Sequence, residues 1–248
     1  GHVNQNALYA MVAQRYRAAH GYDAHAVARV VAHARANAAV NPDAIFFGQT
    51  VSEEDVLASR MIAAPIRMLE IVMPVRGGAA VVVADPAIAA RCRHRAAMIA
   101  GWGERLTHKS PQHAPDLLHP PMEAAATRAF ARAELRPADV DTCQIYDCYP
   151  INTIMTLEAA GFCAHGDGMN FARHHDMRFA GDFPLNTNGG QLGMGQAGYA
   201  GGMTHVVEAF RQISGRAQSR QVPDCDVAFV SGNGGIMSEQ VAMLLEGA

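Results

Sequence analysis

Apolar positions recur at helical spacing in the first part of the chain. Residues 5–20 and 23–39 are rich in alanine, and Asp23 opens the second stretch as an expected N-cap. Residues 52–55 read Ser-Glu-Glu-Asp, which is typical of a helix start, and Pro65 is expected to end that helix. The pattern therefore predicts helices and no sheet over this region.

The pattern changes after these helices. Residues 79–84 carry three consecutive valines and predict a buried strand. Asp85 and Pro86 follow directly and indicate the start of another helix. The organisation changes again near residue 96, so we expect one region at 1–95 and a second at 96–248.

Strand and helix patterns alternate in the second region. We expect strands at 96–102, 142–146, 227–231 and 240–245, an extended piece at 183–186, and helices at 121–135, 151–160 and from 203 onward. This βαβαβαββ order predicts an α/β fold with a mostly parallel sheet covered by helices. Connectors 107–120 and 164–182 are expected to be exposed crossovers.

In such sheets ligands collect outside the carboxyl ends of the strands. We therefore expect the loops after Tyr146, Asn186 and Ser231 to converge on one site.

Residues 186–202 hold seven glycines directly before an amphipathic helix, which continues to Ile213 with Gly215 as its expected cap. The helix places its apolar residues at helical spacing: Val206, Val207, Phe210 and Ile213. Glycine permits positive φ and close backbone approach, and a helix start offers free N–H groups. The segment predicts a binding loop, with a turn that serves only tight helix packing as the alternative.

Composition narrows the class of protein. A net charge of -3 over 248 residues leaves no basic surface for nucleic acid. The five cysteines form no Cys-x-x-Cys pair, which favours a reducing cytoplasm over a disulfide framework or zinc site. No uncharged apolar stretch is long enough for a membrane helix. A small molecule or another protein is the expected partner.

Some polar residues have two interpretations. Asp147 can orient a neighbouring tyrosine or cap the helix that follows it. Cys148 is a small core residue or a site residue. His165, His174, His175 and Asp176 do not match a usual zinc spacing, so no metal is expected.

The loop motifs together resemble a known family. They are Tyr-Asp-Cys-Tyr-Pro at 146–150, the loop at 186–202 and Ser-Gly-Asn-Gly-Gly at 231–235. With the βαβαβαββ order, they resemble the C-terminal half of the thiolase superfamily, most closely its sterol carrier protein and lipid-transfer branch. Upstream, Arg-Ala-Asn-Ala at 35–38 and Gly-Gly-Ala-Ala at 77–80 resemble that family's loop region and the last strand of its N-terminal half.

Thiolases are built from two such halves. By this resemblance, the segment with the acylated cysteine nucleophile is expected upstream of Gly1, so none of the five cysteines here takes that role. The chain is then a fragment or a subunit. A sheet made for two halves exposes an apolar face, so we expect a homo-oligomer or a partner protein such as an OB-fold protein.

The chain departs from thiolases at their acid–base residues. Gln196 stands at the loop histidine, Ser231 at the second catalytic cysteine, and Tyr199 at a glycine. Tyr146 replaces the asparagine or histidine that helps to bind the oxyanion. Two tyrosines in these places resemble the aldolase members of the lipid-transfer branch. A phenol needs a lowered pKa to act as a base at neutral pH.

The resemblance implies a site made from these loops. The expected catalytic residues are Tyr199, Tyr146, Gln196, Asn233 and Gly234. The expected substrate-binding residues are Asn186, Gly189, Gly190, Gly195 and Ser231.

Three functions follow from the resemblance. One is thiolase-type acyl transfer that makes or breaks a carbon–carbon bond in an acyl-CoA. Another is retro-aldol cleavage of a β-hydroxyacyl-CoA such as a steroid side chain, with tyrosines as acid and base. A third is a non-catalytic acyl-CoA or lipid-binding subunit. Coenzyme A is expected as part of the substrate, with no covalently bound cofactor.

Overall fold

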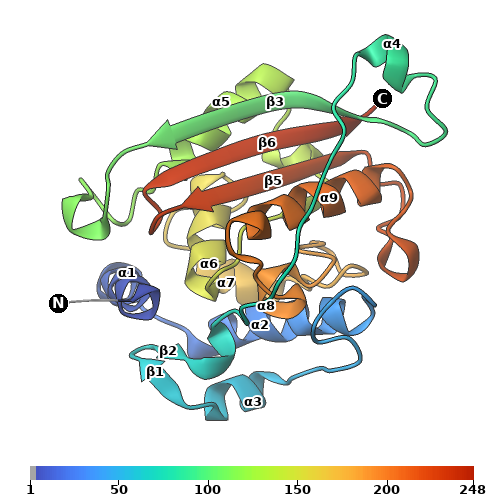
Figure 1. The fold of residues 1–248 in the computed structure, drawn as a ribbon. Coiled ribbons are helices and arrows are strands. Elements are labelled where there is room, and N and C mark those ends of the chain that lie inside the picture. The colour runs from blue at the N-terminus through green and yellow to red at the C-terminus, as the bar shows by residue number, and fades with distance from the viewer. Residues whose placement is uncertain (1–3) are drawn as a thin grey trace.

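The computed structural model describes residues 4–248 (Figure 1). Its helices are α1 (Gln5–His20), α2 (Ala24–Ala39), α3 (Glu53–Ala58), α4 (Pro86–Ala89), α5 (Met122–Ala133), α6 (Pro150–Ala159), α7 (Gly168–His174), α8 (Gly190–Met194) and α9 (Gly201–Ile213). Its strands are β1 (Met61–Ala63), β2 (Ile66–Arg67), β3 (Ala97–Leu106), β4 (Thr142–Gln144), β5 (Val227–Gly234) and β6 (Glu239–Gly247).

Side-chain caps explain where the first helices begin. The carboxylate of Asp23 accepts the backbone N–H groups of His25 and Ala26 at 2.8 and 3.2 Å, which satisfies two donors at the start of α2. Ser52 and Asp55 cap α3 reciprocally, because each side chain accepts the backbone N–H of the other. The helices expected at 5–20 and 23–39 are confirmed. The two-stranded antiparallel hairpin β1–β2 contradicts the expectation of no sheet in this region, and α3 ends at Ala58, well before Pro65, which lies in the hairpin.

Residues 79–84 contradict the expected buried strand. The segment has no regular secondary structure, and the side chains of Val82 and Val83 are 95% and 78% exposed. A strand needs backbone partners and a surface for its side chains, and no strand among residues 4–248 pairs with this segment. In Figure 1 the segment runs up across the sheet as a plain connection to α4, which Asp85 caps.

The main sheet has the strand order β3-β6-β5-β4. β4 and β5 are parallel, whereas β5–β6 and β6–β3 are antiparallel. The α/β class is confirmed, and four of the five expected β segments after residue 96 form strands of this sheet. The sheet has fewer parallel pairs than expected, because the last hairpin places β6 between β5 and β3. The extended piece at 183–186 contributes only an isolated parallel bridge between Leu185 and Cys143.

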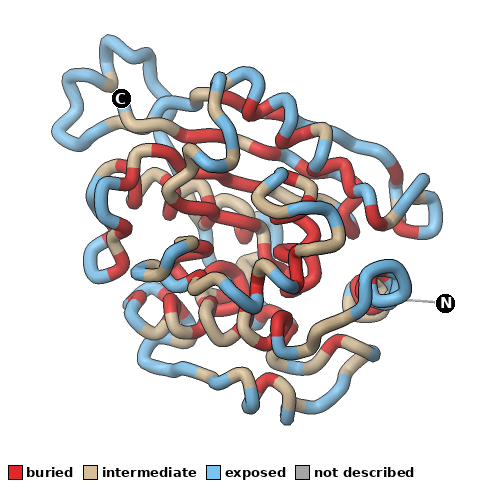
Figure 2. The backbone as a smooth tube through the Cα atoms, turned by 180° about the vertical axis from the view of Figure 1, so that it is seen from behind, coloured by how far each residue is buried: buried red, intermediate tan, exposed pale blue. Residues whose placement is uncertain are grey.

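Alternating strand residues pack against helices on opposite faces of the sheet. Phe229 and Leu244 belong to the larger core cluster, which includes residues of α5 and α6. Their neighbours Ala228 and Leu245 pack with α9 in a second cluster. Gly101 lets α5 lie close to β3, since a Cβ there would be 2.1 Å from the carbonyl oxygen of Ala129. Figure 2 shows the buried residues concentrated in the interior, with exposed residues mainly on the outer turns.

One connecting region and one helix differ from expectation. Residues 164–182 are not an exposed crossover: they contain α7, and Met169, Ala172 and Met177 are buried. The buried residues of α9 include His205, Glu208 and Gln212, so its inner face is largely polar where an apolar face was expected. Val206, Val207 and Phe210 are half-buried, while Ile213 is buried.

Candidate functional site

The segments at Tyr146, Asn186 and Ser231 that were expected to converge do meet at the end of β4, although Ser231 lies within β5 and not at the start of a loop. The backbone N–H of Tyr146 donates to the hydroxyl of Ser231 at 3.0 Å. The amide of Asn186 pairs with the backbone of Ile145, accepting its N–H at 2.7 Å and donating to its carbonyl at 2.9 Å. One side chain of the glycine loop and one of β5 therefore satisfy the backbone where β4 ends, which holds the three segments together.

We call the region where the segments of Tyr146, Asn186 and Ser231 meet the junction. Within it, the side chains of Tyr146 and Gln196 are in polar contact. The side-chain amide of Gln196 donates to the hydroxyl oxygen of Tyr146 at 3.0 Å. Gln196 is held by its backbone as well, which accepts the N–H of Val75 at 3.0 Å and donates to the carbonyl of Met73 at 2.9 Å. Burial raises the pKa of Tyr146 to about 12. The phenol is therefore protonated at neutral pH, and its pKa shifts opposite to the direction that a base requires.

Tyr199 lies in the short 3-10 turn Gly198–Ala200, and its side chain is fully exposed. The structure thus places the phenol of Tyr146 half-buried in the junction and that of Tyr199 in solvent. The two tyrosines belong to the same part of the molecule. Gly202, three residues after Tyr199, lies close to the ring of Tyr146, because a Cβ on it would be 3.6 Å from that ring.

The glycines of the loop let the chain turn around Asp147. Gly189, Gly190 and Gly195 have φ values of 105°, 58° and 99°, a region that side chains disfavour. A Cβ on Gly190 would lie 2.1 Å from a carboxylate oxygen of Asp147. The loop also contains the short helix α8, which the sequence pattern did not predict. Tight packing therefore accounts for Gly190, and the binding role of these glycines stays a prediction.

Asp147 does not cap the helix that follows it in sequence. Its carboxylate accepts the backbone N–H groups of Gln191 at 2.6 Å and Leu192 at 3.3 Å, in the first turn of α8. The N-cap residue of α6 is Tyr149, without a side-chain cap. The aspartate therefore joins the end of β4 to the glycine loop across 44 residues of sequence.

His205 is a site residue that the sequence analysis missed. Its imidazole is fully buried, with Nε2 3.6 Å from a carboxylate oxygen of Asp147 and 3.3 Å from the side-chain nitrogen of Gln191. Burial raises the pKa of Asp147 to about 7 and lowers that of His205 to about 3. The signal in the sequence was polar spacing, because His205, Glu208 and Gln212 lie on one side of a helix.

Asn233 and Gly234 lie within a strand. β5 continues to Gly234, three residues beyond its expected end at Ser231, and it pairs there with β6. The side-chain amide of Asn233 donates to the hydroxyl of Tyr9 at 2.8 Å. Tyr9 comes from α1, a helix that had no expected role in the site.

Cys148 lies beside these groups but is buried, and burial raises the pKa of its thiol to about 12. The thiol is therefore protonated at neutral pH, which makes it a poor nucleophile.

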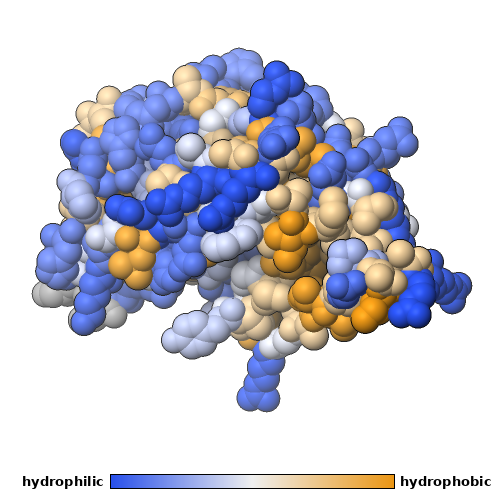
Figure 3. Space-filling view, turned by 90° about the horizontal axis from the view of Figure 1, so that it is seen from above, coloured by the Kyte–Doolittle hydropathy of each residue, from blue (hydrophilic) through white to orange (hydrophobic). Residues whose placement is uncertain are grey.

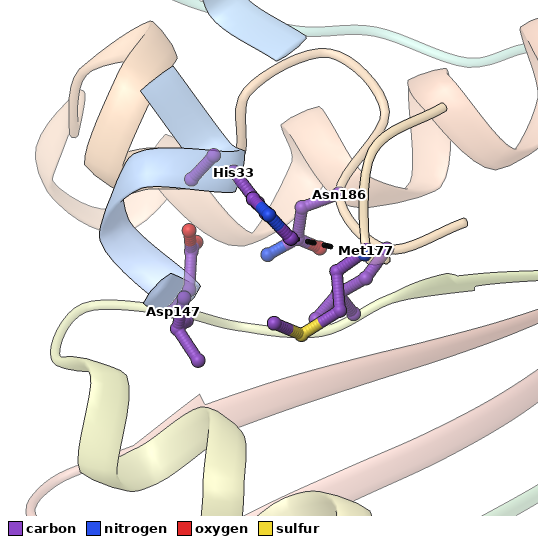
Figure 4. Close-up of a pocket in the computed structure, with 7 residues that line it drawn as sticks. His33, Asp147, Met177 and Asn186 are labelled. Atoms are coloured by element: carbon purple, nitrogen blue, oxygen red, sulfur yellow. Dashed lines mark hydrogen bonds between the residues drawn. The ribbon is translucent and has the colours of Figure 1, made fainter. Parts of the chain in front are cut away.

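A small cavity lies behind the junction, with a volume of about 10 Å³. His33 of α2, Asp147, Met177 and Asn186 surround it (Figure 4). The backbone N–H of Met177 donates to Nδ1 of His33 at 3.1 Å, drawn as a dashed line. Burial lowers the pKa of His33 to about 4, so its ring is neutral at neutral pH. The space is about that of one water molecule.

Among residues 4–248 no three His, Cys, Asp or Glu side chains are grouped to hold a metal ion. In the same range, no helix combines the length and apolar character that a membrane crossing requires.

Comparison with curated proteins finds relatives over most of the chain. A 17-hydroxy-3-oxo-4-pregnene-20-carboxyl-CoA lyase from Mycobacterium tuberculosis is 33% identical over 84% of this chain and 55% of its own length. A steroid side-chain-cleaving aldolase from Thermomonospora curvata is 30% identical over 91% and 58%. An acetyl-CoA acetyltransferase from Methanothermobacter thermautotrophicus is 32% identical over 92% and 60%. The chain thus spans little more than half the length of these relatives.

Solved structures also match over most of the chain. The Ltp2-ChsH2(DUF35) aldolase matches with a TM-score of 0.85 and 25% identity over 97% of this chain and 63% of that one. A monomeric SCP2-thiolase like protein from Mycobacterium smegmatis shares the fold, with a TM-score of 0.75 and 20% identity over 99% and 52%. The family model described as thiolase C-terminal domain-like matches residues 103–247, more than half of the chain. The chain therefore belongs to the thiolase superfamily, in its lipid-transfer and sterol carrier protein branch.

Proposed function

We propose that this chain takes part in carbon–carbon bond cleavage of a β-hydroxyacyl-CoA by a retro-aldol reaction. The observation that carries the proposal is the half-buried phenol of Tyr146, hydrogen-bonded to Gln196 where the three loops meet. At this junction, within residues 4–248, the neighbouring histidine and cysteine are His205 and Cys148, and both are buried. Two relatives named as a lyase and an aldolase support the same reaction class.

The reaction needs proton transfer but no acyl-enzyme. A base removes the proton of the β-hydroxyl group, the Cα–Cβ bond breaks, and a carbonyl forms at Cβ. The electron pair passes to Cα as the enolate of the thioester, which then takes up a proton. Tyr146 suits the second role, because its raised pKa keeps the phenol protonated and ready to donate.

The remaining roles go to neighbouring groups. We assign the base to Tyr199, which the substrate reaches from solvent, a role that requires the bound substrate and its surroundings to stabilise the phenolate. The amide of Gln196 and the backbone near Asn233 and Gly234 are assigned to the thioester oxygen, which gains charge in the transition state. Coenzyme A belongs to the substrate, and the polar groups of Asn186 and Ser231 keep the junction in place.

Substitution of Tyr146 tests this function. In the complete enzyme, Tyr146→Phe should lower turnover of a β-hydroxyacyl-CoA by at least about 10²-fold, because it removes a general acid. Tyr199→Phe should have a similar effect, with both variants unfolding at the wild-type temperature. Tyr22→Phe is the matched control, since Tyr22 lies just before the N-cap of α2 and belongs to none of the segments that meet at the junction. Product formation is measured by chromatography, and wild-type rates in Tyr146→Phe would refute the assignment.

Thiolase-type acyl transfer is the second candidate, because an acetyl-CoA acetyltransferase is among the relatives. That reaction holds the acyl group on a cysteine, a role that the family resemblance gives to none of the five cysteines of this chain, and Cys148 is moreover buried with a raised pKa. Incubation with a β-ketoacyl-CoA and free coenzyme A separates the candidates: a shortened acyl-CoA indicates acyl transfer. Binding without either product indicates a lipid-binding subunit.

We also infer that the chain associates with other polypeptide. Residues 79–84 and strand β3 expose large apolar side chains: Val81, Val82, Val83, Met98, Ile99, Trp102 and Leu106. Figure 3 shows apolar side chains gathered on one side of the upper face. Exposed patches of this kind mark interfaces. The similar aldolase structure carries a DUF35 component in its name, which supports a partner protein here, of OB-fold type by our expectation; a second copy of the chain is the alternative.

A further inference from the structure

Asp147 connects two parts of the junction that the chain does not join directly. It follows Tyr146 at the end of β4, and its side chain is buried. Its carboxylate accepts the N–H groups of Gln191 and Leu192 at 2.6 and 3.3 Å. Hydrogen bonds to an ionised carboxylate are stronger than neutral ones. The carboxylate therefore sets where α8 begins relative to Tyr146.

α8 leads from there to Gln196. The helix ends at Met194 with Gly195 as its C-cap, and the next residue, Gln196, donates its side-chain N–H to the hydroxyl of Tyr146 at 3.0 Å. At the start of α8, Gly190 permits the close approach of the backbone to Asp147, because a Cβ on it would lie 2.1 Å from the carboxylate. Two consecutive residues, Tyr146 and Asp147, thus hold the two ends of one short segment, and a shift at one contact moves the other.

Several titratable groups face this carboxylate. His205 approaches from α9 at 3.6 Å, and His33 of α2 lines the cavity beside it. Tyr146 and Cys148 flank it along the chain. Burial lowers the pKa of His205 to about 3 and of His33 to about 4, and raises those of Tyr146 and Cys148 to about 12. Asp147, with a pKa of about 7, is the member of this group that changes charge near neutral pH.

We propose that Asp147 is a positioning residue that, through α8 and Gln196, holds the hydroxyl of Tyr146 in place for proton transfer to the substrate. The proposal rests on the proposed function, since it assigns a second residue to the same reaction. The ionised carboxylate binds the start of α8, and the protonated form binds it more weakly. Activity therefore rises with pH as this group loses its proton.

Asp141 provides a matched control. It lies just before β4, as Asp147 lies just after it, and its carboxylate also accepts two backbone N–H groups, those of Asp226 and Val227, each at 2.8 Å. Asp141→Asn therefore removes a structural carboxylate of the same kind at the far end of the strand. A loss of activity shared by both variants indicates a general structural effect. A loss of activity confined to Asp147→Asn indicates a positioning role.

The kinetic test compares Asp147→Asn and Asp141→Asn in the complete enzyme with a β-hydroxyacyl-CoA between about pH 5.5 and 8.5. In Asp147→Asn we expect kcat to fall on the order of 10²-fold with little change in KM. The substrate still binds, but the displaced phenol of Tyr146 is no longer in position to donate its proton. The acidic limb of the pH profile should disappear in this variant and persist in Asp141→Asn. Equal losses in the two variants, or an unchanged acidic limb, would overturn the proposal.

An NMR titration tests the coupling without turnover. In the wild-type protein the backbone amides of Gln191 and Leu192 and the side-chain amide of Gln196 should shift with one midpoint, and Asp147→Asn should abolish that step. If the Gln196 signal does not follow the carboxylate, Asp147 does not position the junction, whatever the reaction. If the signals titrate together but no β-hydroxyacyl-CoA is cleaved, the coupling holds and the reaction assignment fails.

Discussion

At the residue scale, Asp147 and His205 are ionisable groups that the fold buries against each other. Burial disfavours the charged form of each, which raises the pKa of Asp147 to about 7 and lowers that of His205 to about 3. Between about pH 4 and 6.5 both are neutral in the native state and charged in the unfolded state. On unfolding, one releases a proton and the other takes one up, so their effects on the pH dependence of stability cancel.

Single substitutions should separate these effects. In His205→Gln only the aspartate remains, whose raised pKa contributes stability at low pH that is lost as pH rises toward 7. The free energy of unfolding of this variant should therefore fall relative to wild type by up to about 1.4 kcal/mol per pH unit between about pH 4 and 6.5. Asp147→Asn should show the opposite slope, because the lowered pKa of His205 contributes stability that is lost as pH falls. Urea unfolding across this range measures both, and curves parallel to wild type would contradict the cancellation.

At the element scale, α8 depends on a glycine contact as much as on its own sequence. The helix has only five residues, too few to be stable alone, and the N–H groups of Gln191 and Leu192 in its first turn are satisfied by Asp147. This contact requires the close approach at Gly190. An element this short forms because another segment completes it.

Gly190→Ala should therefore cost more than the same change at an open glycine. Gly215 is the control, because its φ of 68° resembles the 58° of Gly190 but no atom lies within 4 Å of a Cβ placed there. Gly215→Ala should lower the free energy of unfolding by about 1–2 kcal/mol, the cost of the left-handed backbone. Gly190→Ala should lower it further and reduce turnover. Equal losses from chemical denaturation would show that the contact with Asp147 contributes nothing.

At the scale of the whole molecule, the chain has a complete core around its sheet and an apolar surface beside it. Val82 and Val83 are 95% and 78% exposed, so they contribute little to the stability of this chain. Their place is on a segment that crosses the sheet without pairing with it. The same surface is available for association.

Replacing Val82 and Val83 together by serine should weaken association while leaving the unfolding temperature unchanged, because these side chains contact little within the chain. Phe47→Ser is the control, an exposed apolar residue after α2 that is 53% accessible. Sedimentation velocity of the 248-residue chain over a concentration series measures the effect. A double variant that sediments as wild type does would exclude this segment from the interface.

The sequence by itself determined the helix starts at Asp23 and Ser52, the strand–helix order after residue 96 and the loops that meet at the site. Caps and periodicity act over a few neighbouring residues, so they can be identified in the chain. The family motifs identified the loops. The alternating strand–helix order predicted that these loops lie together at the carboxyl ends of the strands.

Only the tertiary structure decided that Asp147 binds α8, that α9 buries His205 and Glu208, and that residues 79–84 lie exposed. The contacts of Asp147 and Glu208 depend on partners outside their own elements. The partner of Asp147 is the glycine loop, and that of Glu208 is Arg220, whose Nε lies 2.9 Å from Oε1 of the carboxylate. A run of valines looks the same whether or not another strand lies beside it. The physical reason is that burial is a property of the neighbours in space, which the local pattern does not contain.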